Sequence, residues 1–265
     1  MKKNITIKDV AREAGVSVAT VSYVINERSD KRISEQTRKK VLQVINLLDY
    51  VPNQSAKALA TSKSNTVALY VTPDVSVLKN AELLHFVNFM SSFLHKKNYD
   101  LVYLSDTCME KFDHADAILC YDISTEQFRQ IGDNNFIPLI ALNCMVNDPL
   151  FFQINPDYQK IALQAEAYFV QEEFTLVLLE TASQERKESL ESLFKHIIYV
   201  KDFTDISNLA AQNLLVVEQT LYDCLKDHTK VCYLPTLTDE LAEVFLSYME
   251  TAIKRTPIHS HNILV

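Results

Sequence analysis

The sequence predicts an all-α headpiece followed by an α/β domain built on a parallel sheet, and three observations lead to this fold class. A helix-turn-helix pattern fills residues 5–26. From residue 66, short apolar runs alternate with amphipathic stretches. The charge divides at the same place, because residues 1–65 hold 12 Lys and Arg against 6 Asp and Glu, whereas the other 200 residues hold 14 against 28. A basic head beside an acidic body is typical of proteins that bind nucleic-acid phosphates at one end.

The first expected helix begins at about Ile7. Thr6 stands three residues before Asp9, the spacing at which a hydroxyl and an acid cap the start of a helix. Gly15 follows where a tight turn needs a positive φ without a Cβ penalty. The apolar side of this helix is expected to consist of Val10, Ala11 and Ala14.

A second helix is expected after Ser17, whose hydroxyl suits the N-cap position. Its inward positions recur at three- to four-residue spacing and are Val21, Val24 and Ile25. Small and hydroxyl side chains are left on its outward side. Two short helices joined by a glycine-containing turn, the second with such a start, form the helix-turn-helix that enters a DNA major groove.

A third helix is expected to start at Ser34 and to close a three-helix core over the first two, using Val41, Val44, Ile45 and Leu48. It should end near Tyr50, because Pro52 biases the preceding residue away from helical backbone. We therefore place the headpiece over residues 1–50, a hinge helix or linker over 51–63, and the α/β domain over 64–265.

Three runs of this region carry a family resemblance: T-I-K-D-V-A-x-x-A-G-V-S-x-x-T-V-S from Thr6, I-S-x-x-T-R from Ile33, and Y-x-P-N from Tyr50. Together they resemble the DNA-binding headpiece of the lactose-repressor (LacI/GalR) family of bacterial transcription regulators. The resemblance implies a sequence-specific DNA-binding regulator, a repressor rather than an activator, that binds a palindromic operator in double-stranded DNA as a homodimer. Glu27 and Asp49 stand where glycine is common, and Tyr23 stands where many members carry arginine.

The exposed side of the second helix divides into two kinds of side chain. The short polar ones suit phosphate contact, which fixes register without reading sequence; they are Ser17, Thr20, Ser22 and Asn26. Val18, Ala19 and Tyr23 are left to read base edges, where apolar contacts favour thymine methyl groups. We therefore expect weak selectivity for guanine at the base that Tyr23 faces; the alternative is that Tyr23 packs on the third helix. Thr6 of the headpiece and Asn53 of the expected hinge are also expected to contact DNA.

The stretch after Pro52 is alanine-rich, but roughly 8 residues are too few to be helical alone in water. It resembles the family's hinge, P-N-x-x-A-[RK]-x-L, in which paired helices of a dimer lie in the minor groove. By that resemblance Leu59 is the wedge in the central base step, and Ala56 and Lys57 line the groove. An inserted apolar side chain kinks DNA and widens this groove.

The body alternates expected strands and helices, as parallel α/β sheets do. The strands are expected at 66–72, 100–105, 117–120, 139–142, 175–179, 214–217 and 231–234. The helices are expected at 81–97, 124–131, 158–171, 184–195, 219–226 and 239–254. Four segments resemble parts of a periplasmic-binding-protein-like effector domain that is shortened, with an abbreviated second lobe. They are the run from Val71, the strand at Asp116, the turn at Asn155 and the helix start at Glu185.

The body also departs from that family pattern. Val77-Leu78-Lys79-Asn80 replaces the usual Asn-Pro-Phe-Phe, and Glu218-Gln219 replaces Asn-Asp. Glycine, which often shapes ligand-binding βα turns, occurs 2 times in the chain, against roughly 18 at an average usage of about 7%. Two interpretations of the body stay open: a sensor of a small-molecule effector, and a dimerisation scaffold that binds no effector and is controlled through its level or a protein partner.

Two residues are candidates for effector binding. Arg186 lies where family members contact ligand, with a surface salt bridge as the alternative, and Asp74 is either a pocket remnant or a strand-end cap. Cys224, His228 and Cys232 have a metal-like spacing but offer no fourth ligand, so we expect no metal and no cofactor. No catalytic constellation is present, which argues against an enzyme. With no apolar signal core and no run of 18 apolar residues, we expect a cytoplasmic protein that does not enter a membrane and whose five cysteines are buried thiols.

Overall fold

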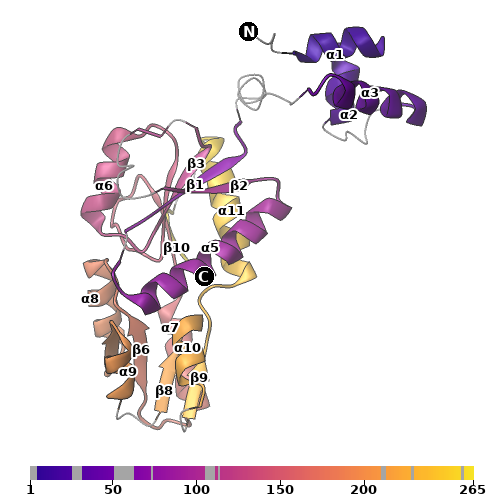
Figure 1. Ribbon diagram of the computed structural model, residues 1–265. Helices are drawn as coiled ribbons and strands as arrows, with labels where there is room; N and C mark the ends of the chain where they lie inside the picture. The colour runs from indigo at the N-terminus through magenta and orange to yellow at the C-terminus, as the bar shows by residue number, and fades with distance from the viewer. Residues whose placement is uncertain are drawn as a thin grey trace. The chain divides into compact units, whose positions relative to one another are not determined.

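The computed structural model describes residues 5–25, 32–50, 63–72, 74–104, 111–112, 114–209, 213–227, 230–257 and 260–265. The chain divides into two compact units, Met1–Ser64 and Asn65–Val265 (Figure 1). Within the described residues, no helix combines the length and the hydropathy that a bilayer span requires. Each unit is described by itself.

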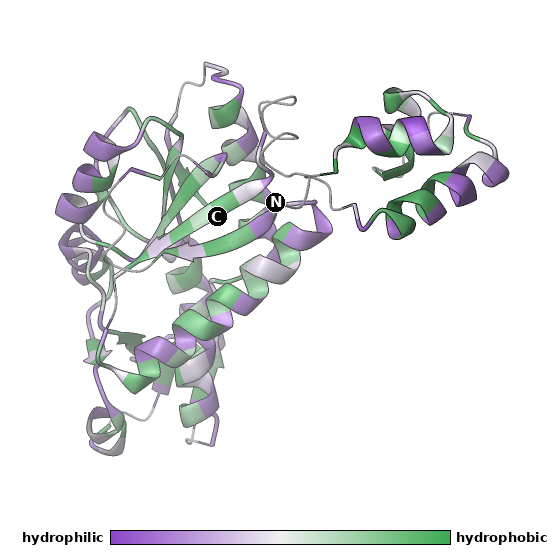
Figure 2. Cartoon of the chain, turned by 45° about the horizontal axis from the view of Figure 1, so that its top comes forward, coloured by the Kyte–Doolittle hydropathy of each residue, from purple (hydrophilic) through white to green (hydrophobic). Residues whose placement is uncertain are grey.

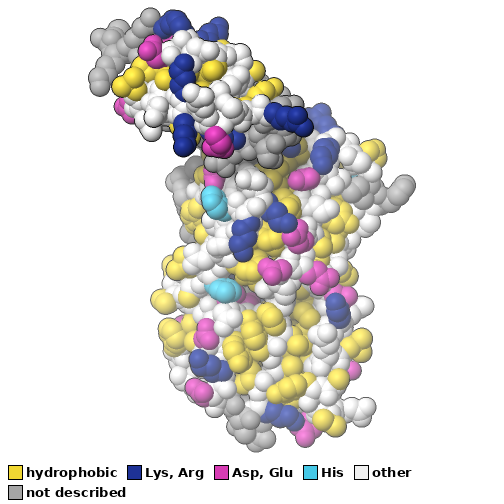
Figure 3. Space-filling view, turned by 90° about the vertical axis from the view of Figure 1, so that its right-hand side faces the viewer, with side chains coloured by type: hydrophobic (Ala, Val, Ile, Leu, Met, Phe, Trp, Pro, Cys, Tyr) yellow, Lys and Arg dark blue, Asp and Glu magenta, His cyan; other side chains and the backbone are white. Residues whose placement is uncertain are grey.

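The first unit is a three-helix headpiece of α1 (Ile7–Ala14), α2 (Val18–Ile25) and α3 (Glu35–Leu47). All three helices begin as the sequence predicts. The core is made almost wholly of small and β-branched side chains, which let the short helices approach closely; it comprises Val10, Ala11, Ala14, Val21, Val24, Val41 and Val44. In the space-filling view, several Lys and Arg side chains lie on the headpiece surface (Figure 3).

The end of the third helix differs from the prediction. α3 ends at Leu47, and Leu48 is its C-cap, so the helix stops before the proline could act. Asp49 follows with a φ of 50°, in the left-handed region. Aspartate tolerates this region better than most residues because its short side chain can bond locally, so it does at this position what glycine commonly does.

The second unit has two lobes, each built on a parallel sheet covered on both faces (Figure 1). The sheet of the first lobe has the order β10-β5-β4-β3-β1-β2. Its strands are β1 (Thr66–Val71), β2 (Asp100–Leu104), β3 (Ala117–Tyr121), β4 (Leu139–Leu142), β5 (Phe152–Asn155) and β10 (Asn262–Leu264). Its helices are α5 (Val77–Lys96), α6 (Thr125–Asn134) and α11 (Asp239–Ile253).

The faces of this sheet are set by alternation along each strand. In β1, Val67, Leu69 and Val71 pack with α5 and α11, whereas Ala68 and Tyr70 point to the opposite face and pack with α6. A strand that is buried on both faces reads as a continuous apolar run, which is how Thr66–Val71 was identified in the sequence. In Figure 2 the strands are largely green, while the outer helices carry purple stripes.

The second lobe has a sheet of the order β7-β6-β8-β9. The strands are β6 (Thr175–Leu179), β7 (Ile197–Val200), β8 (Asn213–Val216) and β9 (Lys230–Tyr233). The helices are α7 (Tyr158–Tyr168), α8 (Gln184–Leu193), α9 (Phe203–Ser207) and α10 (Gln219–Leu225). All strand pairs in both sheets are parallel.

Four short elements are not predicted by the sequence: β5, β7, α9 and β10. Each is five residues or shorter. Helix α5 also begins four residues earlier than predicted. Ser76 is its N-cap, with Oγ accepting a hydrogen bond from the Lys79 amide, so the turn containing Lys79 is helical.

Helix α5 joins the two lobes. Its middle and end pack on the first sheet through Phe86, Met90 and Leu94. Its first turn belongs to the second lobe, because Leu78 is 2% exposed and packs in the core around Val177 and Leu214. Ser76 Oγ, just before the helix, donates to the carbonyl of Lys201 at 2.5 Å. The start of α5 is therefore held at the junction where the two sheets meet.

Candidate functional site

The start of helix α2 is the first candidate site. Ser17 Oγ accepts a hydrogen bond from the Thr20 amide at 3.1 Å and lies 2.9 Å from the Thr20 hydroxyl, so it caps the helix as predicted. Val21 and Val24 fix the inner side of α2 in the core. On the outer side, Val18 is 40% exposed, and Ser17 and Ala19 are exposed as well.

The other candidate DNA-binding residues of the headpiece are less exposed or are engaged in hydrogen bonds. Thr20, Ser22 and Tyr23 are half-buried. Thr6 is exposed, but its hydroxyl donates to Asp9 Oδ2 at 2.7 Å and its amide donates to the same oxygen at 3.0 Å. Hydrogen bonds from Thr6 and the guanidinium of Arg12 hold the pKa of Asp9 below its usual value. Thr6 therefore fixes the start of α1 and presents its hydroxyl beside the carboxylate.

Six of the candidate binding and metal positions lie outside the described residues. They are Asn26, which follows α2 in the sequence, then Asn53, Ala56, Lys57 and Leu59 of the expected hinge, and His228 of the metal-like spacing.

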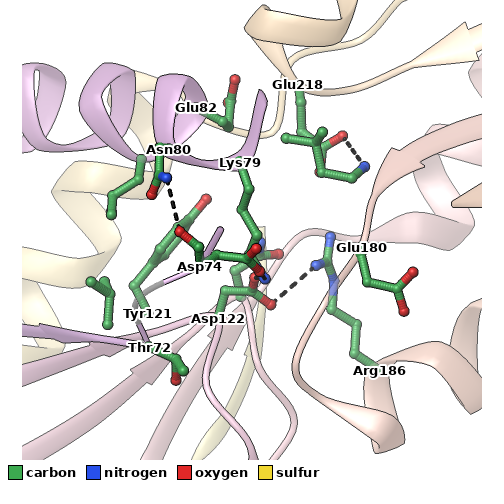
Figure 4. A pocket seen from close by; sticks show the side chains of 14 residues that line it. Thr72, Asp74, Lys79, Asn80, Glu82, Tyr121, Asp122, Glu180, Arg186 and Glu218 are labelled. Atoms are coloured by element: carbon green, nitrogen blue, oxygen red, sulfur yellow. Dashed lines mark hydrogen bonds and ion pairs between the residues drawn. The ribbon is translucent and has the colours of Figure 1, made fainter. Parts of the chain in front are cut away.

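The second candidate site is a cleft between the two lobes of the body (Figure 4). It lies at the carboxyl ends of β1, β3, β4, β6 and β8, where parallel α/β sheets place ligand sites. Its empty volume, including the part open to solvent, is about 480 Å³. The lining residues are Val71, Thr72, Asp74, Lys79, Asn80, Glu82, Leu83, Tyr121, Asp122, Asn143, Leu179, Glu180, Arg186 and Glu218.

A charged network crosses the cleft. Asp122, just after β3, is at its centre: Lys79 Nζ lies 3.0 Å from Oδ2, and Arg186 Nη1 lies 3.7 Å from Oδ1. The Thr181 hydroxyl of the second lobe also donates to Oδ1. Lys79 Nζ is 3.6 Å from Asp74 Oδ2. The first-lobe carboxylates are thus held by a lysine on α5 and by groups from the second lobe.

Arg186 is buried, with 3% of its side chain exposed. It lies in the first turn of α8, where Ser183 Oγ caps its amide at 3.2 Å, and its Nη2 donates to the Tyr158 hydroxyl at 2.7 Å. The interpretation as a surface salt bridge does not fit this burial. Burial alone lowers the pKa of Arg186, but Tyr158, Asp122 and Glu218 raise it above the ordinary value.

Two buried atoms of the lining residues lack a partner. Within the described part of the chain, no acceptor binds Arg186 Nε and no donor binds Asn143 Oδ1. A buried polar atom without a hydrogen bond costs about 1–3 kcal/mol, more for a charged group. Such atoms at the same cleft are therefore a sign of a site for a polar ligand.

A pair of buried carboxyls lies on one side of the cleft. Glu82 of α5 accepts a hydrogen bond from the Thr220 amide at 2.8 Å, and Glu218 accepts one from the Leu179 amide at 3.0 Å. Burial raises the pKa of Glu218 to about 8; Arg186 opposes this rise and the charge of Glu82 adds to it. Glu218 is therefore protonated at neutral pH and can also donate a hydrogen bond.

The two turns that support the network are made without glycine. Asp122 has a φ of 47° and Asn143 a φ of 57°, both left-handed, directly after β3 and β4. Aspartate and asparagine populate this region more readily than other non-glycine residues. The scarcity of glycine therefore does not prevent tight turns at the cleft.

The structure brings the two predicted effector residues, Asp74 and Arg186, to the same cleft. Asp74 Oδ1 also accepts from the Ser76 amide at 2.8 Å, so it caps the end of the strand as well. Lys79, Asp122 and Asn143 also line the cleft, but the sequence does not predict them as effector-binding residues. A polar residue directly after each apolar strand was the pattern that could have identified the last two.

The cysteines fit the prediction only in part. Cys120, Cys144 and Cys232 are buried thiols, but Cys224 is exposed, because it falls on the outer side of the short helix α10. Among the described residues, no group of three or more His, Cys, Asp or Glu side chains could hold a metal. Cys108 is not among these residues.

Comparison with known proteins identifies the family of the headpiece. Residues 6–53, which contain all three headpiece helices, match the model of the bacterial regulatory proteins of the lacI family. The chain is 32% identical over 216 residues to the probable HTH-type transcriptional repressor ExuR of Bacillus subtilis (strain 168), covering 74% of this chain and 62% of that protein. The headpiece of this chain is therefore a lacI-family domain.

Two further comparisons are consistent with this headpiece domain. It is 57% identical over 72 residues to catabolite control protein A of Streptococcus mutans serotype c (strain ATCC 700610 / UA159), covering 27% of this chain and 21% of that protein. Its fold is similar to that of a lac repressor dimer solved with operator and the anti-inducer ONPF, with a TM-score of 0.63, 16% identity, and 99% and 96% of the two chains covered. The chain matches less than two thirds of the length of these two curated relatives.

Proposed function

We propose that this chain is a LacI-family DNA-binding transcription regulator, a repressor, that binds a palindromic operator as a homodimer through its second helix. The exposed start of α2 carries the proposal. Val18 and Ala19 project from a helix that Val21 and Val24 hold in the core, so small side chains are presented on a rigid support. Such a helix fits a major groove, where apolar side chains contact thymine methyl groups. The name of ExuR as a repressor supports the direction of regulation, and no catalytic activity is proposed.

The test is selection of bound fragments from a randomised duplex library with the full chain, followed by affinity measurement on the selected site. Ala19→Glu adds a negative charge at the exposed start of α2 and is expected to abolish specific binding. Gln43→Glu makes the same charge change on the exposed side of α3 and is the matched control. Equal loss in both variants, or no enriched sequence, would rule out reading of DNA by α2.

The homodimer part of the proposal draws on an exposed apolar surface of the first lobe. Leu84 of α5 is 60% exposed, and Val102 and Tyr103 of the neighbouring edge strand β2 are 37% and 47% exposed. Sedimentation of the full chain is expected to give a dimer that Leu84→Glu dissociates. Leu163→Glu, at a 67% exposed leucine of α7 in the second lobe, is the control that should leave the dimer intact.

For the body we propose a sensor role, in which a small molecule bound in the cleft shifts the lobes between two states by its differential affinity. The unpartnered buried atoms of Arg186 and Asn143 support this role. The alternative is a dimerisation scaffold, which the direct contacts between the lobes favour, since Asp122 already binds Arg186 and Thr181 without a ligand. A ligand screen by thermal unfolding separates the two.

A further inference from the structure

We propose that the cleft binds a small primary amine that also carries an oxygen acceptor, and that the ammonium of this ligand replaces that of Lys79. The proposal rests on the sensor role and names the chemical class of its ligand; it does not depend on how the headpiece reads DNA.

The protein already contains a binding site for an ammonium group, and the ammonium of Lys79 occupies it. Lys79 Nζ lies between Asp122 Oδ2 at 3.0 Å and Asp74 Oδ2 at 3.6 Å, and 17% of the lysine side chain is exposed (Figure 4). Lysine is attached by a flexible four-carbon stem, so it can leave the site and regain water without unfolding α5. A ligand ammonium can then form the same two charge contacts.

The charge balance of the lining requires a cation at this place. The carboxyl side chains are Asp74, Glu82, Asp122, Glu180 and Glu218, and the basic ones are Lys79 and Arg186. Glu180 is neutralised outside the cleft by Lys187 and Lys201. When Lys79 leaves, Asp122 keeps its contact with Arg186, but Asp74 has no cationic partner among the described residues. A partly buried carboxylate is costly without a compensating charge. A phosphorylated ligand would add further negative charge and is disfavoured.

A neutral sugar does not meet this requirement. It can hydrogen-bond to the carboxylates but cannot replace the lysine charge, so Lys79 stays in place. Displacement of Lys79 is thus the electrostatic condition for entry.

The oxygen acceptor follows from an independent observation. Arg186 is 3% exposed, lines the same cleft, and its Nε has no acceptor within the described residues. A hydroxyl or carboxylate oxygen of the ligand would satisfy this donor. The ammonium site and Arg186 lie on either side of Asp122, which contacts both, so one small molecule can reach the two groups.

The experiment is thermal unfolding of the full chain with five compounds: glucosamine, serine, glucose, N-acetylglucosamine and glucose 6-phosphate. Glucosamine has the ammonium with hydroxyls, and serine has it with a carboxylate; the other three lack the cation. We expect a rise in Tm of roughly 5–10 °C at about a hundred times the Kd of the preferred amine. A shift with glucosamine alone identifies an amino sugar, and a shift with serine alone identifies an amino acid. Equal shifts with glucose, or no shift with either amine, overturn the proposal.

Lys79→Met tests the displacement itself. This variant empties the ammonium site, so its Tm without ligand should fall, and the amine should bind roughly tenfold tighter because nothing competes. Lys97→Met is the matched control, since Lys97 pairs with Glu243 on the surface and does not line the cleft. The same amine affinity in Lys79→Met, Lys97→Met and the unaltered chain overturns the proposal.

Two safeguards keep the outcomes separate. If Lys79→Met does not fold, the five-compound panel on the unaltered chain decides by itself. Operator affinity of the unaltered chain, measured without ligand, reports on DNA binding and not on the ligand of the cleft. If the chain does not bind DNA but an amine still raises its Tm, the regulator function is contradicted and the proposed ligand class stands. If the chain binds DNA but no amine raises its Tm, the ligand class is contradicted and the regulator function stands.

Discussion

Arg186 Nη1 of the second lobe lies 3.7 Å from Asp122 Oδ1 of the first lobe. Both side chains are largely buried, with exposures of 3% and 11%. Asp122 also binds Lys79 and accepts a hydrogen bond from Thr181, so one carboxylate joins α5, the end of β3 and two positions of the second lobe. The relative position of the lobes therefore depends on the charge of this residue.

Replacing Asp122 by asparagine should destabilise the body. The side chain keeps its shape but loses the charge that compensates Arg186 and Lys79, and removing one partner of a buried pair costs about 3–5 kcal/mol. Denaturant unfolding of the full chain measures the change. Asp223→Asn, at an exposed residue of α10 that pairs with Lys226 at 3.8 Å, should change stability by less than about 1 kcal/mol. Similar effects of the two substitutions would contradict the role of Asp122.

Replacing Glu218 by glutamine should remove a pH dependence of stability. The pKa of Glu218 is raised from the ordinary 4.5 to about 8 in the folded protein. Between these values the folded state holds a proton that the unfolded chain has lost, so stability falls as pH rises through this window, by up to about 1.4 kcal/mol per pH unit. Glutamine keeps an acceptor for the Leu179 amide without the charge. Unfolding at pH 5, 6, 7 and 8 should show the variant losing less stability than the unaltered chain; parallel curves would contradict this.

The two glycines should respond oppositely to alanine. Gly15 has a φ of 65°, so a Cβ there is strained although its nearest neighbour, Lys40 Nζ, is 3.7 Å away; Gly15→Ala should destabilise the headpiece by about 1 kcal/mol. Gly132 lies in α6, where an added Cβ would meet Phe151 and Leu139 at ordinary contact distances. Gly132→Ala should therefore be neutral or stabilise by up to about 1 kcal/mol. Thermal unfolding of both variants is the measurement, and stabilisation by Gly15→Ala would be the contrary result.

The operator position that faces Tyr23 should show only weak selectivity for guanine. A tyrosine hydroxyl offers one contact, whereas an arginine forks onto the two acceptors of guanine. The selected operator half-sites should show a variable base at this position, and Tyr23→Arg should convert it to guanine. A strongly fixed guanine with the unaltered chain would count against base reading by Tyr23 and for its packing on α3.

Leu59→Ala should weaken operator binding without unfolding the headpiece. Burial of a leucine side chain contributes about 1.5–3 kcal/mol, so loss of the proposed wedge is expected to reduce affinity roughly 10- to 100-fold. Fluorescence anisotropy with operator DNA measures the affinity, and circular dichroism checks the helices. Leu59 lies outside the described residues, so this prediction stands on the hinge motif alone. Unchanged affinity would exclude the wedge.

The sequence by itself determined the headpiece. Its capping residues, its turn glycine and its inward valines lie within some 40 residues, and their spacing predicts α1, α2 and the start of α3 because helix caps and helical periodicity are local properties. The longer buried strands were equally readable, since burial on both faces leaves a continuous apolar run.

Only the tertiary structure decided what surrounds Arg186. Asp122 follows β3, Lys79 lies in the first turn of α5, and Glu218 follows β8. These side chains are up to 139 positions apart in the chain, so no local spacing relates all three. They meet because parallel strands place their carboxyl ends at one edge and α5 spans both lobes. Burial, and not residue type, then sets the charge of Glu218 and leaves Arg186 Nε without an acceptor among the described residues.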